Sequence, residues 1–400
     1  MREWTIRQIH ILENRETARS ELPPVFSHAG AGAAMAFHKQ LEGYSKTSLV
    51  SLPRLSEKWN VGGIYVKDES KRFSLNAFKG LGGSYAMFRI ICEKLGLDPA
   101  RTSLNALTEG PYRESISQLE FVTCTDGNHG RGVCWAAGLF GCRAHVFMPY
   151  GSREVRAEAI RRAGPAEVVI TDLSYDDAVK HALEMSRKHG WILLQDTAWD
   201  GYERIPAWII QGYLTMAAEV SEELDRLQVQ PTHLFLQAGV GAMAGGIVSY
   251  FANRCGKDKP IVAIVEPEAA DCIYRSAKAG TVCSVGGAPE TIMAGLNCGT
   301  PCRLTWPVLR DYAEFYLSGP DEMAADGMRT YAAGFEGDPK IISGESGAAT
   351  LGAVRRLLEE PDFAEVKAAM GLDETSVLLL INTEGDTDPE NYRSIVARDP

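Results

Sequence analysis

Residues 234–246 read LFLQAGVGAMAGG, a short apolar run followed by glycines and then by small, helix-compatible residues. This order predicts a buried strand, a tight turn and a helix, which together form the repeating unit of α/β proteins. Backbone N–H groups at the start of such a helix bind phosphate, because the helix dipole adds to their hydrogen bonds. A turn that only packs a strand against a helix needs the same glycines, so this stretch leaves both interpretations open.

The same alternation of apolar runs and helical segments extends over the rest of the chain. Several runs are apolar throughout, which favours parallel strands covered by helices on both faces. We therefore expect an α/β protein, and its 400 residues favour two domains. The polar residues 97–118 are expected to form an irregular surface insertion. The predicted strands are residues 63–69, 121–125, 144–149, 167–171, 191–196, 233–238, 261–267 and 376–382. The predicted helices are residues 79–96, 127–139, 152–163, 175–189, 203–226, 241–255, 321–334 and 346–359.

The composition excludes several classes of partner. A net charge of −11 argues against nucleic acid and anionic membranes, because both need a basic surface. Residues 234–252 carry no charge, but their glycines favour a strand, turn and helix over a membrane span. The N-terminal segment MREWTIRQIH lacks the apolar core of an export signal, so we expect a cytoplasmic protein. Nine cysteines without zinc-ligand spacing predict no metal site, and the sequence leaves open whether Cys272 and Cys298 pair.

A lysine in an unusual setting supplies a chemical clue. Residues 73–88 read FSLNAFKGLGGSYAMF and place Lys79 between an aromatic ring and several glycines. An apolar environment lowers the pKa of a lysine and yields the neutral amine that imine formation needs. Together with a phosphate-binding turn, this lysine predicts a Schiff base to pyridoxal phosphate.

Polar side chains gather where predicted strands end, and ligands of α/β sheets bind at the carboxyl ends of strands. Asp126 and Asn128 lie in the turn TCTDGNHGRG, Asp196 ends a buried run beside aromatic residues, and Thr383 follows the last strand. An aspartate between a strand and a helix is often only a helix N-cap, so Asp126 has that alternative role.

Seven motifs, spread in order between about residues 30 and 395, resemble those of the fold-type-II pyridoxal-phosphate enzymes. Relatives in that family include threonine dehydratase, cysteine synthase and the tryptophan synthase β chain, and the motifs are most similar to those of the diaminopropionate ammonia-lyases. The motifs are NAFKGLGGSYA, TDGNHGRGV, QDTAWDGY, QAGVGAMAGG, AGLNCGTP, SGESGA and NTEGDTDP.

The resemblance implies two open, twisted, mostly parallel sheets covered by helices, with the active site between two domains. The large domain would comprise residues 1–81 and 189–400, and the small domain residues 82–188. The family is typically homodimeric and binds a small amino-acid substrate.

The resemblance also assigns roles to individual residues. Lys79 would form the Schiff base, Asn128 would contact the phenolic oxygen of the cofactor, and Thr383 would face its pyridine nitrogen. The phosphate cradle would consist of Gly239, Val240, Gly241, Ala242 and Met243. The candidates for contact with the substrate are Asp126, Asp196, Glu345 and Ser346.

One departure from the family pattern concerns the reaction. The dehydratases carry a small or hydroxyl residue where this chain has Asp126, and an acid there suits a substrate with a second amine or a general base. We therefore expect α,β-elimination of 2,3-diaminopropionate, of both enantiomers, to pyruvate and ammonia, with Asp126 or Asp196 as the second base. The alternative on the same fold is a serine/threonine dehydratase or a β-replacing synthase. A nucleotide-binding dehydrogenase is disfavoured, because the glycine spacing at 239–245 misses the dinucleotide fingerprint by one residue. A non-catalytic binding module would require that Lys79 not bond the cofactor.

Overall fold

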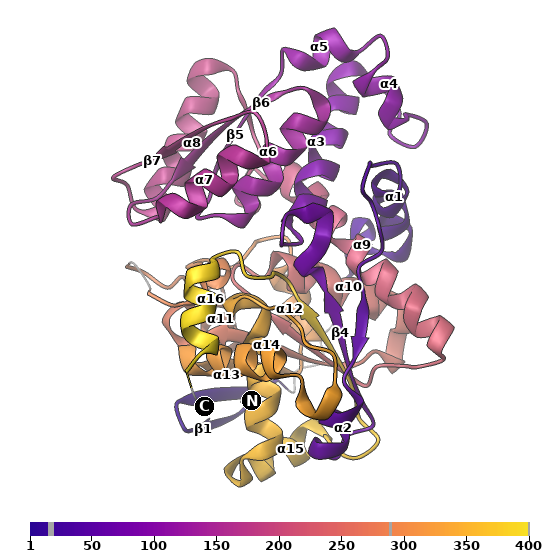
Figure 1. The fold of residues 1–400 in the computed structure, drawn as a ribbon, viewed down its shortest axis with the longest axis vertical. Coiled ribbons are helices and arrows are strands. Elements are labelled where there is room, and N and C mark those ends of the chain that lie inside the picture. The colour runs from indigo at the N-terminus through magenta and orange to yellow at the C-terminus, as the bar shows by residue number, and fades with distance from the viewer. Residues whose placement is uncertain (15–19, 288–289, 399–400) are drawn as a thin grey trace. The chain divides into compact units, whose positions relative to one another are not determined.

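The computed structural model describes residues 1–14, 20–287 and 290–398. The chain forms two compact units (Figure 1). The first unit comprises Met1–His28, Lys46–Lys71 and Met216–Pro400, and the second comprises Ala29–Ser45 and Arg72–Thr215.

The first unit is built on an eight-stranded sheet with the order β1-β2-β11-β10-β9-β12-β4-β3. Its five inner strands, from β11 to β4, run parallel, whereas β2 and β3 add antiparallel edges. The strands are Arg2–Ile6, Ile9–Glu13, Phe315–Gly319, Ile261–Pro267, His233–Gln237, Val377–Asn382, Gly63–Asp68 and Leu49–Ser51, in that sheet order. The helices of this unit are α2 (Pro53–Trp59), α10 (Ala242–Cys255), α11 (Cys272–Ala279), α12 (Trp306–Tyr312), α13 (Asp321–Ala333), α14 (Glu345–Glu359), α15 (Ala364–Met370) and α16 (Pro389–Val396).

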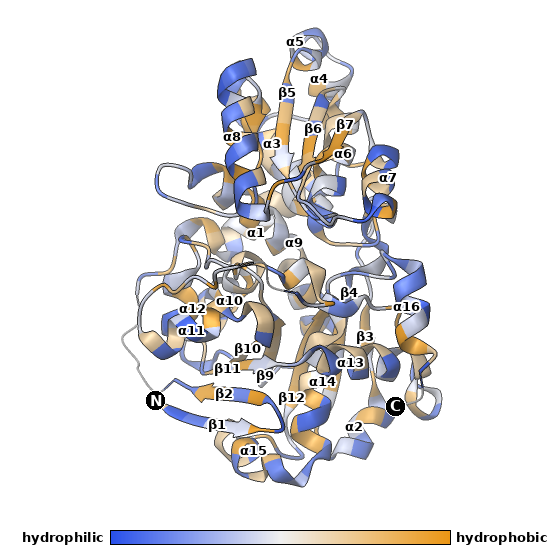
Figure 2. Cartoon of the chain, turned by 90° about the vertical axis from the view of Figure 1, so that its left-hand side faces the viewer, coloured by the Kyte–Doolittle hydropathy of each residue, from blue (hydrophilic) through white to orange (hydrophobic). Residues whose placement is uncertain are grey.

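The second unit contains a four-stranded parallel sheet with the order β7-β6-β5-β8. The strands are Ala166–Ile170, Arg143–Met148, Glu120–Cys124 and Ile192–Leu193, in that sheet order. The helices are α1 (His28–His38), α3 (Lys79–Leu95), α4 (Leu104–Thr108), α5 (Arg113–Ser117), α6 (Asn128–Phe140), α7 (Glu154–Ala163), α8 (Tyr175–His189) and α9 (Arg204–Leu227), the last of which continues into the first unit. Figure 2 shows strands β5 and β6 in hydrophobic colours beside helix α8, which carries hydrophilic residues along one side.

These sheets confirm the predicted α/β class with two mostly parallel sheets. All eight predicted strands and all eight predicted helices are present, with bounds that shift by a few residues. The segment 234–252 forms part of β9, a turn and part of α10. Among the described residues, no helix is both long and apolar enough to cross a membrane.

Two predictions about local structure were wrong. The run 191–196 contributes only Ile192–Leu193 to the sheet, because the side chain of Gln195 turns back and accepts hydrogen bonds from Cys124 N and Thr123 Oγ1. The segment 97–118 is not irregular, since it contains α4 and α5. Each of these short helices buries one apolar side chain, Leu107 or Ile116.

The predicted domain boundaries stay a prediction, and the compact units divide the chain differently. They assign 29–45, 72–81 and 189–215 to the second unit. Packing explains part of this assignment, because a Cβ atom at Gly212 of α9 would lie 2.5 Å from Leu81 O of α3. Helices in such close backbone contact belong to the same compact unit.

Candidate active site

Lys79 is the first residue of α3 and follows Phe78. Its Nζ donates a hydrogen bond to Asp196 Oδ2 at 2.6 Å. The same nitrogen lies 5.3 Å from the ring centroid of Phe78 and 5.6 Å from that of Tyr213, within reach of a cation–π attraction. The side chain of Lys79 is 22% exposed. The aromatic environment that the sequence predicts around Lys79 is therefore present, with one carboxylate added to it.

Glycines allow neighbouring helices to approach the start of α3. A Cβ atom at Gly82 would overlap the ring of Tyr213, and one at Gly132 of α6 would lie 2.9 Å from the carbonyl of Lys79. Any larger residue at these positions would push a helix away from Lys79. The glycines around the lysine are thus packing requirements that fix its position.

The turn after β5 presents Asp126 without using it as a helix cap. Helix α6 begins at Asn128, and its N-cap residue is Gly127. The orphan N–H groups of Gly127 and Gly130 donate to Thr125 Oγ1 at 3.0 and 3.2 Å. The alternative that Asp126 serves as the helix N-cap is therefore wrong, because Thr125 provides the capping oxygen.

The environments of Asp126 and Asp196 drive their pKa values apart. Burial raises the pKa of Asp126, and the charges of Arg156 and Lys79 only partly oppose this. Burial also acts on Asp196, but His129 and Lys79 outweigh it and lower the pKa of Asp196 to about 2. Asp196 is thus ionised at neutral pH, whereas Asp126 is a weaker acid than an ordinary aspartate. Two carboxyls with such different proton affinities are typical of acid–base sites.

In the first unit, the glycine turn between β9 and α10 has the features of a phosphate cradle. The N-cap of α10 is Gly241, with a φ of +79°, and no side chain of the described residues caps this helix. A Cβ atom at Gly241 would lie 2.6 Å from Leu309 Cδ1, and one at Gly239 would lie 3.1 Å from Cys298 Sγ. Both interpretations of the sequence therefore hold here. The glycines are needed for packing, and the start of the helix has no side-chain acceptor.

Thr383 follows β12 and is buried. Its Oγ1 accepts a hydrogen bond from Gln237 Nε2 at 3.0 Å, and that amide also donates to Ile381 O at 2.9 Å. Because Oγ1 accepts from Gln237, the hydroxyl proton of Thr383 can be donated to a further acceptor. This arrangement suits a neutral hydrogen bond to a ring nitrogen.

Comparison with known proteins adds the identity of the family to this geometry. A family model described as "Pyridoxal-phosphate dependent enzyme" matches residues 41–370. The chain belongs to this family. It is 45% identical over 97% of its length to the diaminopropionate ammonia-lyase of Escherichia coli K12, of which it covers 96%. It is 48% identical over 90% of its length to that of Salmonella typhimurium LT2, of which it covers 90%.

Solved structures agree with this assignment. Diaminopropionate ammonia lyase from Escherichia coli in complex with D-serine has a TM-score of 0.91 at 44% identity, with 97% of each chain covered. The same enzyme in complex with an aminoacrylate-PLP azomethine reaction intermediate has a TM-score of 0.90, also over 97% of each chain. Threonine deaminase isoform 2 from Solanum lycopersicum, at 18% identity and a TM-score of 0.71, shares the fold.

Each unit, taken by itself, has residues whose chemistry suits pyridoxal phosphate. In the first unit, the uncapped N–H groups at the start of α10 suit the phosphate, and a Cβ atom at Gly241 would crowd the turn that holds it. Thr383 offers a hydroxyl for the pyridine nitrogen. In the second unit, Lys79 would supply the primary amine that bonds the aldehyde carbon, and this role stays a prediction.

Two further predicted residues, Glu345 and Ser346, lie at the start of α14 and are buried. Glu345 Oε1 accepts a hydrogen bond from Asn391 of α16. Ser346 Oγ accepts one from Gly295 N at 3.1 Å, and Ser346 N donates to Glu384 Oε1 at 3.2 Å. Both residues are thus held in the first unit by contacts with other segments of that unit, and their role toward the substrate stays a prediction.

Cys272 and Cys298 flank the glycine turn. Cys272 Sγ donates to Gly239 O at 3.4 Å, and burial raises the pKa of this thiol far above its ordinary range. Cys298 Sγ lies 3.1 Å from the position that a Cβ atom of Gly239 would occupy. Cys272 is therefore an inert, protonated thiol at this position.

Three polar residues at these sites had no role assigned from the sequence. His129 lies next to Asp196, Gln237 orients Thr383, and Glu384 contacts the start of α14. His129 and Glu384 stand inside the quoted motifs, so their proximity to candidate residues was a usable signal. Gln237 is the last residue of β9 and precedes the glycine turn. This position was a weaker signal of a functional role.

Proposed function

We propose that this protein catalyses the pyridoxal-phosphate-dependent α,β-elimination of 2,3-diaminopropionate to pyruvate and ammonia, and that it accepts both enantiomers. The observation that carries the proposal is Asp126, a half-buried carboxyl that caps no helix and interacts with both Lys79 and Asp196. A dehydratase acting on serine or threonine has no need for this additional acid. The high identity to diaminopropionate ammonia-lyases over nearly the whole chain supports the same substrate.

The residues have distinct tasks in this reaction. Lys79 provides the amine for the cofactor and removes the α-proton on one face of the substrate. Asp126, with its raised pKa, exchanges a proton on the opposite face. Asp196 remains ionised and holds an ammonium group, either that of Lys79 or the second amine of the substrate.

The cofactor supplies an electron sink for the charge that develops when the α-carbon loses its proton. In this proposal the N–H groups of 239–243 bind the phosphate and Asn128 contacts the phenolic oxygen. The hydroxyl of Thr383 donates to the ring nitrogen without protonating it fully. A weakly protonated ring favours loss of a leaving group over transamination.

The test is the variant Lys79→Ala. It should lose the absorbance band at about 410–420 nm that marks the bonded cofactor. It should also lose pyruvate formation from diaminopropionate. Lys94→Ala is the matched control, since Lys94 lies exposed on the same helix. A Lys79→Ala variant that keeps both the band and turnover contradicts the proposal.

The substrate is tested by incubation of the wild-type protein with diaminopropionate, serine and threonine. Pyruvate from diaminopropionate at the highest kcat/KM supports the proposal. Preferred release of pyruvate from serine, or of 2-oxobutyrate from threonine, would assign the protein to the dehydratases instead.

We further propose that the protein is a cytoplasmic homodimer, as the resemblance to its family implies. Sedimentation of the purified protein at micromolar concentration measures its mass directly. A mass near twice the 43.7 kDa of one chain supports the dimer, and a single-chain mass contradicts it.

A further inference from the structure

Three buried histidines make the same type of hydrogen bond. His38, His129 and His233 each place Nε2 at 2.8–3.0 Å from a backbone carbonyl oxygen, those of Leu81, Leu194 and Met370 respectively. A carbonyl oxygen only accepts, so Nε2 carries the proton in all three rings. In a neutral ring, Nδ1 must then accept a hydrogen bond.

The group that faces Nδ1 differs in His129. His38 Nδ1 lies 2.7 Å from Thr215 Oγ1 and His233 Nδ1 lies 2.8 Å from Thr232 Oγ1, and either hydroxyl can donate. His129 Nδ1 instead faces a carboxylate oxygen, Asp196 Oδ2, at 3.6 Å. Within the described parts of the chain, Nδ1 of His129 has no hydrogen-bond partner.

An ionised carboxylate and an unprotonated Nδ1 are both hydrogen-bond acceptors. They can form a hydrogen bond with each other only if one of them gains a proton. On its other side, Asp196 Oδ2 accepts a hydrogen bond from Lys79 Nζ at 2.6 Å. Asp196 therefore stands between two basic groups, and only one of them carries a positive charge when His129 is neutral. Burial disfavours the charged form of His129 and lowers its pKa, and Lys79 lowers it further, whereas Asp196 opposes both.

The other titratable groups around Asp196 do not compete for this proton. Cys124 and Tyr202 interact with Asp196, but burial raises the pKa of each above the ordinary range, so both stay neutral. Asp126 interacts with both Lys79 and Asp196, and Arg156 lowers its pKa more than Lys79 does. Besides Lys79, His129 is thus the basic side chain that the described residues place against this carboxylate.

We propose that His129 is a positioning residue that stores the proton released when Lys79 becomes a neutral amine. The proton leaves Nζ of Lys79, passes through the carboxylate of Asp196 and binds Nδ1 of His129. The charges change from ammonium, carboxylate and neutral imidazole to neutral amine, carboxylate and imidazolium, so their sum stays constant. The inference rests on the proposed function only in taking Lys79 as the amine that bonds the cofactor.

The direct test is the nitrogen NMR spectrum of the histidine rings in the full chain at neutral pH. In the wild type without cofactor, His129 should be neutral with its proton on Nε2. In Lys79→Met the ammonium is gone, and His129 should become an imidazolium with both nitrogens protonated. His38 and His233 are internal controls and should stay neutral in both proteins. An unprotonated Nδ1 of His129 in both proteins overturns the proposal.

A second measurement uses the pH dependence of cofactor bonding. In His129→Gln, the midpoint pH at which added pyridoxal phosphate produces its absorbance band should rise by about one unit, because Lys79 must then lose its proton to solvent. His38→Gln is the matched control and should leave the midpoint unchanged. A purely structural role of His129 would reduce the amount of bound cofactor without moving the midpoint, and that result contradicts the proposal.

The outcomes separate this inference from the proposed function. If the wild type neither bonds pyridoxal phosphate nor forms pyruvate, the proposed function fails. If it does both while the His129 signals and the midpoint stay fixed, only the role of His129 fails.

Discussion

Two aspartates near Lys79 have pKa values that are shifted in opposite directions. Asp196 is held as an anion by two basic neighbours, whereas burial makes Asp126 a weaker acid. If both enantiomers of the substrate bind with their other groups in the same places, their α-protons would point to opposite sides, and Lys79 would reach only one of them. An enzyme that uses both enantiomers needs a second base, and Asp126 has the proton affinity for that role.

We expect Asp126→Asn to remove most activity on D-diaminopropionate and to weaken the L reaction less. The acid limb of the D activity in the wild type should lie above the ordinary aspartate range, because a base works only when deprotonated and the pKa of Asp126 is raised. Measurement of kcat/KM for each enantiomer against pH tests this. Asp196→Asn is the control and should reduce both activities. Equal, small losses for Asp126→Asn would show that Asp126 is not the second base.

At the residue scale, the sequence predicts the chemistry of single positions better than their partners. Lys79 stands out because its neighbours along the chain are apolar or glycine. The contacts Lys79–Asp196 and Gln237–Thr383 join residues far apart in the sequence, and no local pattern reveals them. The capping hydrogen bonds to Thr125 Oγ1 were missed, because the aspartate one residue later is also a good capping residue.

At the scale of single elements, the start of α10 offers a test of the phosphate cradle. Gly241 is a poor choice for substitution, because its positive φ and its contact with Leu309 would strain any larger residue. Val240 is half-buried in the same turn and carries neither constraint. Val240→Asp adds one negative charge beside the proposed phosphate.

We expect Val240→Asp to bind pyridoxal phosphate at least about tenfold more weakly, because two like charges at close range repel. Val240→Asn has nearly the same shape without the charge and should retain most of the affinity. Titration of the cofactor absorbance band measures both. Equal affinity of the two variants for pyridoxal phosphate would show that this turn has only a structural role.

Helices α13 and α14 make the closest element contact in the first unit. A Cβ atom at Gly352 would overlap the carbonyl oxygen of Met323, and one at Gly327 would overlap that of Ala348. The two helices therefore touch backbone to backbone, which only glycine allows. Neither backbone can move aside without disturbing the whole helix.

We expect Gly352→Ala to lower the free energy of unfolding by about 3 kcal/mol or more, because the clash is with backbone rather than with a flexible side chain. Gly32→Ala is the matched control, since Gly32 is also helical and a Cβ atom there meets nothing within 4 Å. It should stabilise the protein by up to about 1 kcal/mol. Urea unfolding of both variants gives the comparison, and equal effects would show that the crossing can relax.

The sequence predicts the central elements and misses the edges. All strands of the parallel layers except β11 follow from apolar runs, whereas β1, β2 and β3 were not predicted. These three strands are antiparallel additions. Strand β1 is mostly exposed, β3 has only three residues, and β2 is buried where it pairs with β11. Their pairing depends on the tertiary edge that they cover, so short-range patterns carry little information about it.

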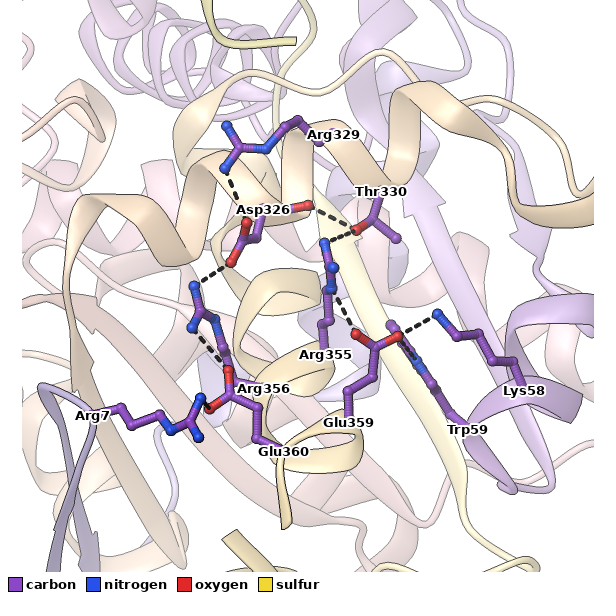
Figure 3. A network of polar contacts seen from close by, with 10 residues as sticks. All are labelled: Arg7, Lys58, Trp59, Asp326, Arg329, Thr330, Arg355, Arg356, Glu359 and Glu360. Carbon is purple, nitrogen blue, oxygen red and sulfur yellow. Dashed lines mark hydrogen bonds and ion pairs between the residues drawn. The ribbon is translucent and has the colours of Figure 1, made fainter. Parts of the chain in front are cut away.

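At the scale of the whole molecule, charged side chains join segments that are distant in the sequence. Figure 3 shows Asp326 of α13 between Arg329 and Arg356. Arg356 also donates to Glu360 at 2.8 Å, and Glu360 pairs at 3.2 Å with Arg7 from the turn between β1 and β2. One connected network thus ties the turn between β1 and β2 to helices α13 and α14 of the first unit.

A second branch of the contacts in Figure 3 centres on Glu359 at the end of α14. It accepts hydrogen bonds from Lys58 and from Trp59 of α2, the latter at 2.9 Å, and from Arg355 at 2.9 Å. Burial opposes the ionisation of Glu359, but these three donors outweigh it and lower the pKa from 4.5 to about 2. A carboxylate whose pKa is lowered in the folded state stabilises that state at pH values above its pKa in the unfolded chain.

We therefore expect Glu359→Gln to lower the free energy of unfolding by about 1–2 kcal/mol at pH 7, a figure reduced for the solvent screening of a side chain that is partly exposed. The deficit should persist down to about pH 5 and then shrink as the pH falls through the interval between 4.5 and about 2, where the wild-type carboxylate gains its proton. Urea unfolding of both proteins at several pH values measures it. Glu57→Gln, in an exposed pair on the same α2 surface, is the control and should change little. A deficit that stays constant with falling pH would mean that lost packing, rather than the charge of Glu359, holds α2 against α14.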